Sequence, residues 1–147
     1  MNIIKMEKRT GDYGIEAIDE NDNTLHTDSS IEKGGRNYGF RPMQMILASL
    51  GSCSAIDIVS ILKKQKQTVE DLKIRIEGER EQKEIPSVWK SGNIFSEIYG
   101  NIDEEKVRKA TALSMDKHGS VAETLRRGGT HITWHLNVIN SKTAVAQ

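Results

Sequence analysis

The sequence predicts an α+β fold, in which a largely antiparallel sheet packs against helices around one long central helix. Three observations lead to this prediction. They are an apolar stretch of helical period over residues 41–65, segments of alternating polarity on both sides of it, and a length of 147 residues, which suits a single domain over residues 1–147. The expected order is three strands, the long helix, two strands, two helices and a last strand.

The long helix is the element around which the others are organised. Its apolar residues recur at steps of three and four, and Pro42 suits the first turn. Gly51 lies in its middle, where glycine costs about 1 kcal/mol relative to alanine, so we expect another backbone to approach closely there. Because the helix is apolar on more than one side, we expect a homodimer in which a partner subunit completes the core.

Six segments have the alternating polarity and the flanking turn signals of strands. The expected strands are residues 2–8, 12–19, 24–27, 69–80, 94–102 and 130–139. In the last of these, four apolar side chains are expected to face inward, namely Ile132, Trp134, Leu136 and Val138.

Two further helices are expected between the last two strands. Asp103 is expected to cap the first helix, and Gly119 to end it in the position after a helix that glycine favours. Ser120 and Glu123 form the Ser-x-x-Glu pattern of a capping box, which predicts a short helix over residues 121–127. The tail, residues 141–147, is expected to be frayed.

The composition excludes several classes of function. The 21 basic and 21 acidic residues balance, so nothing draws the chain to nucleic acid or to an anionic membrane. Asp57 and the serines interrupt the best apolar stretch, so no membrane span is expected. The first residues lack the pattern of a secretory signal, and a single cysteine cannot form an internal disulfide. We therefore expect a cytoplasmic protein.

No motif indicates a metal or a cofactor. The sequence has no Cys-x-x-Cys and no His-Glu-x-x-His, and its four histidines include no pair at the helical spacing of metal ligands. The glycine-rich segment 34–39 lacks the Gly-Lys-Ser/Thr end of a phosphate-binding loop. It is interpreted as a lead-in to the long helix.

Three segments carry a resemblance to a known family. They are FRPMQMILASLGSCSAIDIVSILKK at residues 40–64, FSEIYGNIDEEKVRKATALSMDKHGSVAETL at residues 95–125, and the closing strand. In these segments and in the order of its elements the chain resembles the OsmC/Ohr family of osmotically inducible and organic-hydroperoxide-resistance proteins, and within it the YhfA-like branch. The resemblance implies an OsmC-like fold, which is an intertwined homodimer with two long central helices and active sites at the subunit interface.

The resemblance also implies a chemistry. In enzyme members of the family, a cysteine on the central helix attacks an organic hydroperoxide and becomes a sulfenic acid, and a second cysteine then forms a disulfide with it that an external dithiol reduces. Cys53 falls on the first cysteine. Gly119 stands in place of the second, and Met43 in place of a glutamate that helps to position the thiolate. For the arginine of the family, Arg36 and Arg41 are the nearest candidates, followed by Arg9.

Two interpretations of Cys53 stay open. Its helical position alone favours a small core residue, whereas the resemblance favours a reactive thiol. A free thiol, with a pKa of about 8.5, is only a few per cent ionised at neutral pH, so a positive group must reach Cys53 if it is to react quickly. Arg36, Arg41 and a protonated His118 are candidates, although the helix dipole also explains a histidine at a helix end. Arg126 and Arg127 are expected to be solvated.

Three functions follow from these observations. The first is a thiol-dependent peroxidase of oxidative-stress defence that reduces organic hydroperoxides through Cys53 alone, with an external thiol or dithiol as reductant. The second is a non-catalytic dimer that binds a small apolar ligand, as the residues at 43 and 119 suggest. The third is a redox sensor in which Cys53 forms a mixed disulfide that alters a partner contact.

Overall fold

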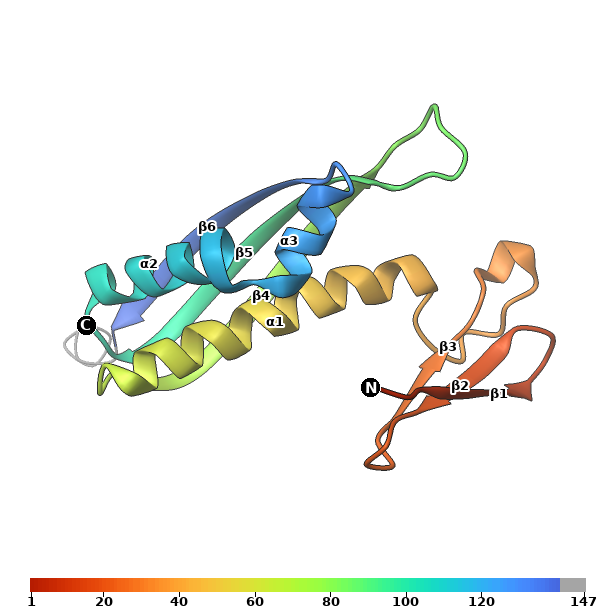
Figure 1. Cartoon of the computed structure of the whole chain (residues 1–147), viewed down its shortest axis with the longest axis horizontal. Coiled ribbons are helices and arrows are strands. Elements are labelled where there is room, and N and C mark those ends of the chain that lie inside the picture. The colour runs from red at the N-terminus through yellow and green to blue at the C-terminus, as the bar shows by residue number, and fades with distance from the viewer. Residues whose placement is uncertain (141–147) are drawn as a thin grey trace. The chain divides into compact units, whose positions relative to one another are not determined.

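The structure, a computed structural model, describes residues 1–140, and the tail expected to be frayed lies outside these residues. The element order is the predicted one, with three strands, a long helix, two strands, two α-helices and a last strand (Figure 1). The contacts divide the chain into two compact units, residues Met1–Ile46 and the residues from Leu47 onward. That the whole chain acts as one domain stays a prediction.

The first unit contains a three-stranded antiparallel sheet. Its strands β1 (Lys5–Thr10), β2 (Gly14–Ile18) and β3 (Thr24–Thr27) lie in the order β1-β2-β3. β1 begins three residues later than predicted, because the pairing with β2 starts at Lys5 opposite Ile18. A short 3-10 helix (Ile31–Lys33) follows the sheet.

A buried carboxylate organises the loop that leads into the long helix. Asp28 is 3% exposed and accepts hydrogen bonds from the backbone N–H groups of Ser29, Arg36 and Tyr38 at 2.7, 2.9 and 3.1 Å. The bond from Arg36, followed by those from Tyr38 and Ser29, lowers the pKa of Asp28 below its usual range. The glycine-rich segment is therefore a folded loop. A Cβ at Gly39 would come 2.0 Å from the carbonyl oxygen of His26, which no side chain allows.

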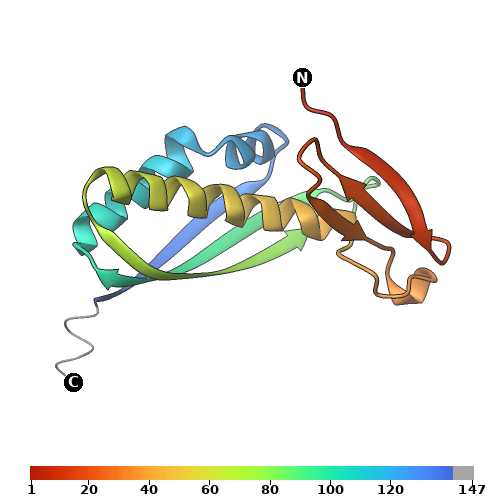
Figure 2. The ribbon, with the colours of Figure 1, turned by 90° about the horizontal axis from the view of Figure 1, so that it is seen from below.

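The second unit is a sheet with helices on one of its faces. Strands β4 (Thr68–Arg80), β5 (Trp89–Asn101) and β6 (His131–Asn140) form the order β4-β5-β6. The long helix α1 (Pro42–Lys64), which begins in the first unit, crosses this sheet on the same side as α2 (Glu104–Leu113) and α3 (Ser120–Arg127) (Figure 2).

The last strand corrects one detail of the prediction. β4 and β5 pair antiparallel, but β5 and β6 pair parallel, so the second sheet is mixed. The reason is the connection between them, because α2 and α3 carry the chain back along one face of the sheet, as crossovers between parallel strands do. β5 also begins five residues before its predicted start, at Trp89.

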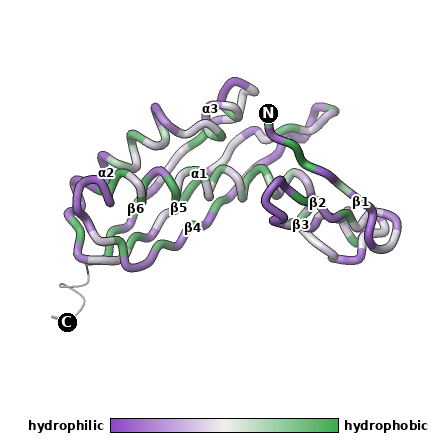
Figure 3. The backbone as a smooth tube through the Cα atoms, turned by 60° about the horizontal axis from the view of Figure 1, so that its bottom comes forward, coloured by the Kyte–Doolittle hydropathy of each residue, from purple (hydrophilic) through white to green (hydrophobic). Residues whose placement is uncertain are grey.

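The core of the second unit lies between the helices and the inner face of the sheet. One cluster joins Ile58 and Leu62 of α1 to Ile98 of β5 and Val107 of α2, and a second joins Leu50 of α1 to Ile94, Met115 and Ala122. The side chains predicted to face inward from β6 pack against these two clusters. Figure 3 shows hydrophobic segments recurring along α1 and all three strands.

Gly51 has the packing role that its position predicted, but a side chain and not a backbone approaches it. A Cβ at this position would lie 2.6 Å from Cδ1 of Ile76 and 3.5 Å from Cγ2 of Ile74. Both isoleucines belong to β4. The glycine therefore lets α1 lie close to the first strand of the second sheet.

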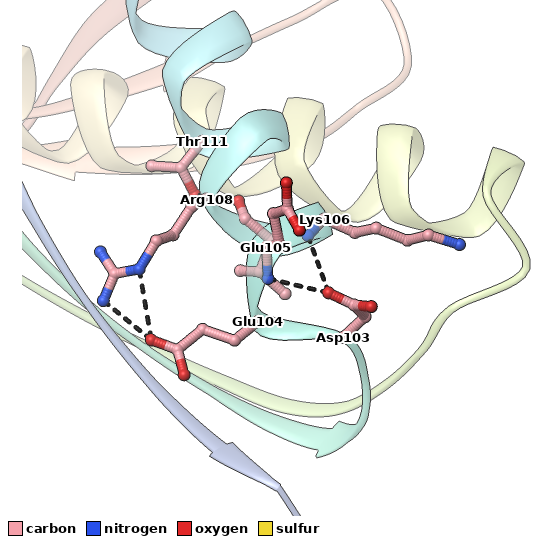
Figure 4. A network of polar contacts seen from close by, with 7 residues as sticks. Asp103, Glu104, Glu105, Lys106, Arg108 and Thr111 are labelled. Carbon is pink, nitrogen blue, oxygen red and sulfur yellow. Dashed lines mark hydrogen bonds and ion pairs between the residues drawn. The ribbon is translucent and has the colours of Figure 1, made fainter.

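The cap of α2 is confirmed. The carboxylate of Asp103 accepts hydrogen bonds from the backbone N–H groups of Glu105 and Lys106 at 2.9 and 3.2 Å (Figure 4). In the first turn, Glu104 forms an ion pair with Arg108 at 2.9 Å. Both features stabilise the N-terminal end of the helix, where free N–H groups and the positive end of the dipole lie.

The end of this helix differs from the prediction. The chain continues from α2 into a π-helical segment, η2 (Ser114–His118), which the N–H of Gly119 closes by bonding to the carbonyl of Ser114 at 2.6 Å. Gly119 has φ −71° and ψ 96°, so it does not adopt the left-handed conformation that glycine favours after a helix. The predicted capping box is also wrong, because α3 already includes Ser120 and its cap is Gly119.

The length and composition of α1 differ from the expectation that no apolar run reaches membrane-spanning length. By length and composition alone, α1 is a candidate span, because Asp57 is its one charged residue before Lys63. Only 28% of its most apolar stretch is buried within this chain. Ile56 is 64% exposed and Val59 is 38% exposed. Among the described residues, the rest of the second unit therefore leaves apolar surface of this helix uncovered.

Candidate functional site

Cys53, the only cysteine of the chain, lies in the middle of α1 and is half-buried. Two side chains of the same part of α1 bond to η2. The Ser54 hydroxyl donates to the sulfur of Met115 at 3.3 Å, and Asp57 accepts a hydrogen bond from the Ser114 hydroxyl at 3.2 Å. The helical segment that carries Cys53 is thus fastened to η2 by two polar contacts.

Gly119, which stands where the family resemblance places a second cysteine, follows directly after η2. His118 is the exposed last residue of η2, and Gly119 is buried next to it. A Cβ at Gly119 would lie 2.7 Å from the carbonyl oxygen of Ser114, closer than real Cβ atoms come to backbone. Any side chain at position 119 therefore requires a shift in η2.

The two candidate arginines belong to the first unit, whereas Cys53 belongs to the second. The N–H of Arg36 bonds to Asp28, and the side chain of Arg36 lies beside Gly11. The N–H of Arg41 bonds to the side chain of Gln44 at 3.1 Å. A role for either guanidinium toward Cys53 stays a prediction.

Arg126 is more buried than the sequence predicted. It was expected to be solvated, but it is half-buried and one of its guanidinium nitrogens donates to the carbonyl of Met115. A π-helical turn leaves carbonyl groups without the usual partners, and an arginine in the following helix can bond to one of them. Arg127, as expected, is exposed and pairs with Glu123 at 2.8 Å.

A depression of about 250 Å³ opens beside η2 and the start of α3. Its lining residues come from these two segments and are mostly charged, namely Met115, Asp116, Lys117, Gly119, Glu123, Arg126 and Arg127. A neighbouring depression of about 440 Å³ shares three of them and reaches His131 and Ile132 at the start of β6. We call the smaller one the η2 depression.

The described part of the chain, residues 1–140, holds no group of three or more histidine, cysteine, aspartate or glutamate side chains arranged to bind a metal ion. The side chains that line the η2 depression are mostly charged and can form hydrogen bonds with a ligand. A site of this kind recognises charged groups by ion pairs and hydrogen bonds.

Comparison with known proteins gives consistent results. The sequence profile of the family described as "OsmC-like protein" matches residues 34–135. The chain is 36% identical over 99 residues to Protein YhfA of Escherichia coli strain K12, a match that covers 67% of this chain and 72% of the relative.

Solved structures show the same fold. The OsmC-like protein of Mycoplasma pneumoniae superposes with a TM-score of 0.78 at 15% identity, over 95% of this chain and 97% of that chain. An organic hydroperoxide resistance protein OsmC from Legionella pneumophila superposes with a TM-score of 0.69 at 17% identity, over 94% of this chain and 97% of that chain. From the profile match and the identity to YhfA, we conclude that this chain belongs to the OsmC family.

Proposed function

We propose that this protein is a thiol-dependent peroxidase of oxidative-stress defence that reduces organic hydroperoxides through Cys53 alone. The thiolate of Cys53 attacks one oxygen of the O–O bond, forming a sulfenic acid and releasing the other oxygen as an alcohol after protonation. An external thiol then displaces water from the sulfenic acid and forms a mixed disulfide. A second thiol releases Cys53 as a thiol and leaves with the first as a disulfide.

The observation that carries this proposal is the position of Cys53. It is half-buried, in a part of α1 that is fastened to η2 through Ser54 and Asp57. A half-buried thiol is open to a small peroxide on one side, whereas a fully buried one is not. Structural neighbours that are organic hydroperoxide resistance proteins lend further support to this class of chemistry.

The proposal includes a homodimer. The uncovered apolar side chains of α1, Ile56 and Val59 among them, leave water when a second copy of the chain covers them. Light scattering should report about twice 16.5 kDa at working concentration. A monomer would contradict this part of the proposal, and binding to lipid vesicles in place of self-association would assign the apolar face of α1 to a membrane.

A second candidate is a non-catalytic dimer that binds a small apolar ligand. The observation that favours it is the tight space at Gly119, where the carbonyl of Ser114 leaves no room for a second cysteine. Met43, which stands where the family resemblance places a glutamate, also favours this candidate. A redox sensor that stops at a mixed disulfide on Cys53 is the third candidate.

Peroxide consumption by the purified protein separates these candidates. Cumene hydroperoxide and hydrogen peroxide are supplied in turn, with dithiothreitol or dihydrolipoamide as reductant, and Cys53→Ser serves as the control variant. Many turnovers per protein that vanish in Cys53→Ser would support the peroxidase. A single oxidation that mass spectrometry detects at Cys53, without turnover, would favour the sensor. No reaction above the control would favour ligand binding.

A further inference from the structure

We infer that Asp57 is a catalytic residue of the reaction proposed above, in which its carboxylate carries the proton of the Cys53 thiol to the oxygen that leaves the peroxide. The inference rests on the proposed function, because it assigns a further residue to the same reaction. It adds a proton carrier to that reaction, and it makes Ser114 the residue that positions the carrier.

Asp57 lies one helical turn beyond Cys53 on α1. Side chains four residues apart on a helix are neighbours, with about 5–6 Å between their Cβ atoms. Helical side chains also lean toward the N-terminal end of the helix, so the carboxylate of Asp57 lies over the turn that carries Cys53. Both residues belong to the second unit. The helix alone therefore places a carboxylate next to the thiol.

The thiol and the carboxylate also lie on the side of α1 that meets η2. Leu50, three residues before Cys53, packs in one cluster with Met115 of η2. Asp57 accepts a hydrogen bond from Ser114, which also belongs to η2. Leu50, Cys53 and Asp57 follow one another at steps of three and four, which keeps them on one side of the helix. Cys53 therefore lies along the border between α1 and η2, which agrees with its half-burial.

The carboxylate of Asp57 is held at one of its two oxygens. The hydroxyl of Ser114, a residue with 0% exposure, donates a hydrogen bond to Oδ2 at 3.2 Å. Within residues 1–140, Oδ1 accepts no hydrogen bond and Asp57 forms no ion pair. A proton carrier needs a fixed position and an oxygen that is open to the reacting atoms, and Asp57 has both.

Other ionisable groups near this part of the second unit are less suited to carry the proton. α1 has no other charged residue until its last turn. In η2, the side chains of Asp116, Lys117 and His118 are exposed. Arg126 bonds to a backbone carbonyl of η2, and a guanidinium does not release its proton in a protein. Asp57 is therefore the half-buried group of this region that can both accept and release a proton.

The proposed step consists of one proton transfer and one displacement. The thiol proton passes to Oδ1 of Asp57, so the single negative charge of the two groups moves to the sulfur of Cys53. The sulfur attacks the terminal oxygen of the hydroperoxide, the O–O bond breaks, and its electron pair leaves with the other oxygen. Asp57 gives its proton to that oxygen, which departs as an alcohol. Cys53 is then a sulfenic acid and Asp57 is a carboxylate again.

The role of Asp57 can be tested by changing the leaving group of the peroxide. Cumene hydroperoxide releases an alkoxide, a strong base that needs a proton as it leaves, whereas peracetic acid releases acetate, a weak base that does not. Reduced protein, freed of other thiols, is mixed with an excess of each peroxide in a stopped-flow instrument. Dimedone labelling and mass spectrometry identify the sulfenic acid at Cys53. The ratio of the two rate constants reports proton donation to the leaving oxygen.

Asp57→Asn keeps the size of the side chain and an oxygen for the Ser114 hydroxyl, but it cannot carry the proton. We expect this variant to lower the rate constant with cumene hydroperoxide about 100-fold and the rate constant with peracetic acid less than about threefold. Ser114→Ala should lower the rate with cumene hydroperoxide about tenfold, because the carboxylate loses its fixed position.

Two further variants serve as controls. Asp57→Glu keeps a carboxylate at this position and should recover most of the rate that Asp57→Asn loses. Glu70→Gln removes an exposed carboxylate of β4 that forms no ion pair within the described residues. It changes the net charge by the same amount as Asp57→Asn and should change neither rate constant.

Each result for Asp57→Asn decides the inference. A loss confined to cumene hydroperoxide, with Glu70→Gln unchanged, supports it. Equal losses with both peroxides would indicate damage around Cys53 and would overturn the proton transfer. An unchanged or faster reaction with cumene hydroperoxide would also overturn it, because the carboxylate would then act only as a negative charge that opposes the thiolate.

The same measurements separate this inference from the proposed function. If the wild-type protein reacts with cumene hydroperoxide and Asp57→Asn keeps the wild-type ratio of rate constants, the peroxidase stands without a role for Asp57. If wild-type Cys53 reacts with peracetic acid alone, or with neither peroxide, the peroxidase is overturned and the role of Asp57 falls with it.

Discussion

The hydroxyl of Ser54 donates a hydrogen bond to the thioether sulfur of Met115, with 3.3 Å between Oγ and Sδ. Both side chains are almost fully buried, and they join the middle of α1 to η2 across 61 residues of sequence. The contact ties the helix that carries Cys53 to the wall of the η2 depression. Its strength can be measured.

A double-mutant cycle on Ser54 and Met115 tests this contact. Met115→Leu keeps the volume but leaves the buried Ser54 hydroxyl without its sulfur partner, and we expect a loss of about 1–3 kcal/mol in the free energy of unfolding. Ser54→Ala removes the donor as well, so in that background Met115→Leu should cost less, by about 0.5–1 kcal/mol. Denaturant unfolding at fixed protein concentration gives all four values. Strictly additive costs would mean that the two side chains do not interact.

The space at Gly51 gives a second prediction. In Gly51→Val the added methyl groups meet Cδ1 of Ile76, and overpacking should cost about 1–3 kcal/mol of unfolding free energy. Ile76→Val removes Cδ1, so Gly51→Ala in that background should recover up to about 1 kcal/mol from the higher helix propensity of alanine. Urea unfolding of the single and double variants measures both effects. A Gly51→Val protein as stable as the wild type would contradict the close approach of α1 to β4.

Position 119 gives a third prediction. Gly119→Ala keeps an allowed backbone conformation but brings Cβ to 2.7 Å from the carbonyl of Ser114, so we expect a loss of about 1–3 kcal/mol. Gly92→Ala is the matched control, because its nearest neighbour would be Cδ2 of Leu50 at an ordinary 3.5 Å. Thermal unfolding of the two variants compares them directly.

The same clash bears on the missing second cysteine. If Gly119→Cys were as stable as the wild type and formed a disulfide with Cys53 after peroxide treatment, position 119 would accept a resolving cysteine. Mass spectrometry of the non-reduced protein detects that bond. This result would contradict the clash between a side chain at position 119 and the carbonyl of Ser114.

Asp28 gives a prediction about pH. The N–H groups of Arg36, Tyr38 and Ser29 lower its pKa in the folded protein from the ordinary value of 3.8. A carboxylate with a lowered folded pKa stabilises the fold above its unfolded pKa, and this contribution is lost as the pH falls from 3.8 through the folded value. The amide proton shifts of Arg36 and Tyr38 should therefore titrate with a midpoint below 3.8.

Asp28→Asn is the control for this titration, because it keeps the size of the side chain and removes its charge. The acid transition of the Arg36 and Tyr38 amide shifts should vanish in this variant. A midpoint at or above 3.8 in the wild-type protein would contradict the hydrogen-bonded carboxylate.

The sequence predicted most of the fold because its local signals agree with the packing. The helical period of residues 41–65 predicted α1 almost to its ends, at Pro42 and Lys64. Asp103 predicted the start of α2 because a capping carboxylate acts on residues next to it in sequence. Features of this kind depend on neighbouring residues and are visible before the chain is folded.

The features that the sequence did not predict depend on distant residues. Residues 107–118 fit ordinary helical spacing, and nothing in their sequence indicates the π-helical turn. This turn places Ser114 against Asp57 and Met115 against Ser54. Arg126 was misjudged for the same reason, since its partner is a carbonyl that only this turn exposes. The direction of β6, in contrast, could have been predicted from the sequence. A connection that contains two helices favours parallel pairing of the strands it joins, here β5 and β6.

The parallel pairing of β6 also constrains the order in which the second unit folds. β4 and β5 are joined by a short connection and can pair as a local hairpin, whereas β6 reaches β5 only after α2, η2 and α3 have been traversed. We therefore expect the hairpin to acquire protection from hydrogen exchange early in refolding and β6 to acquire it last. During synthesis on the ribosome, β6 also emerges after every other described element. Until β6 pairs with β5, α1 therefore packs against a sheet that contains only β4 and β5.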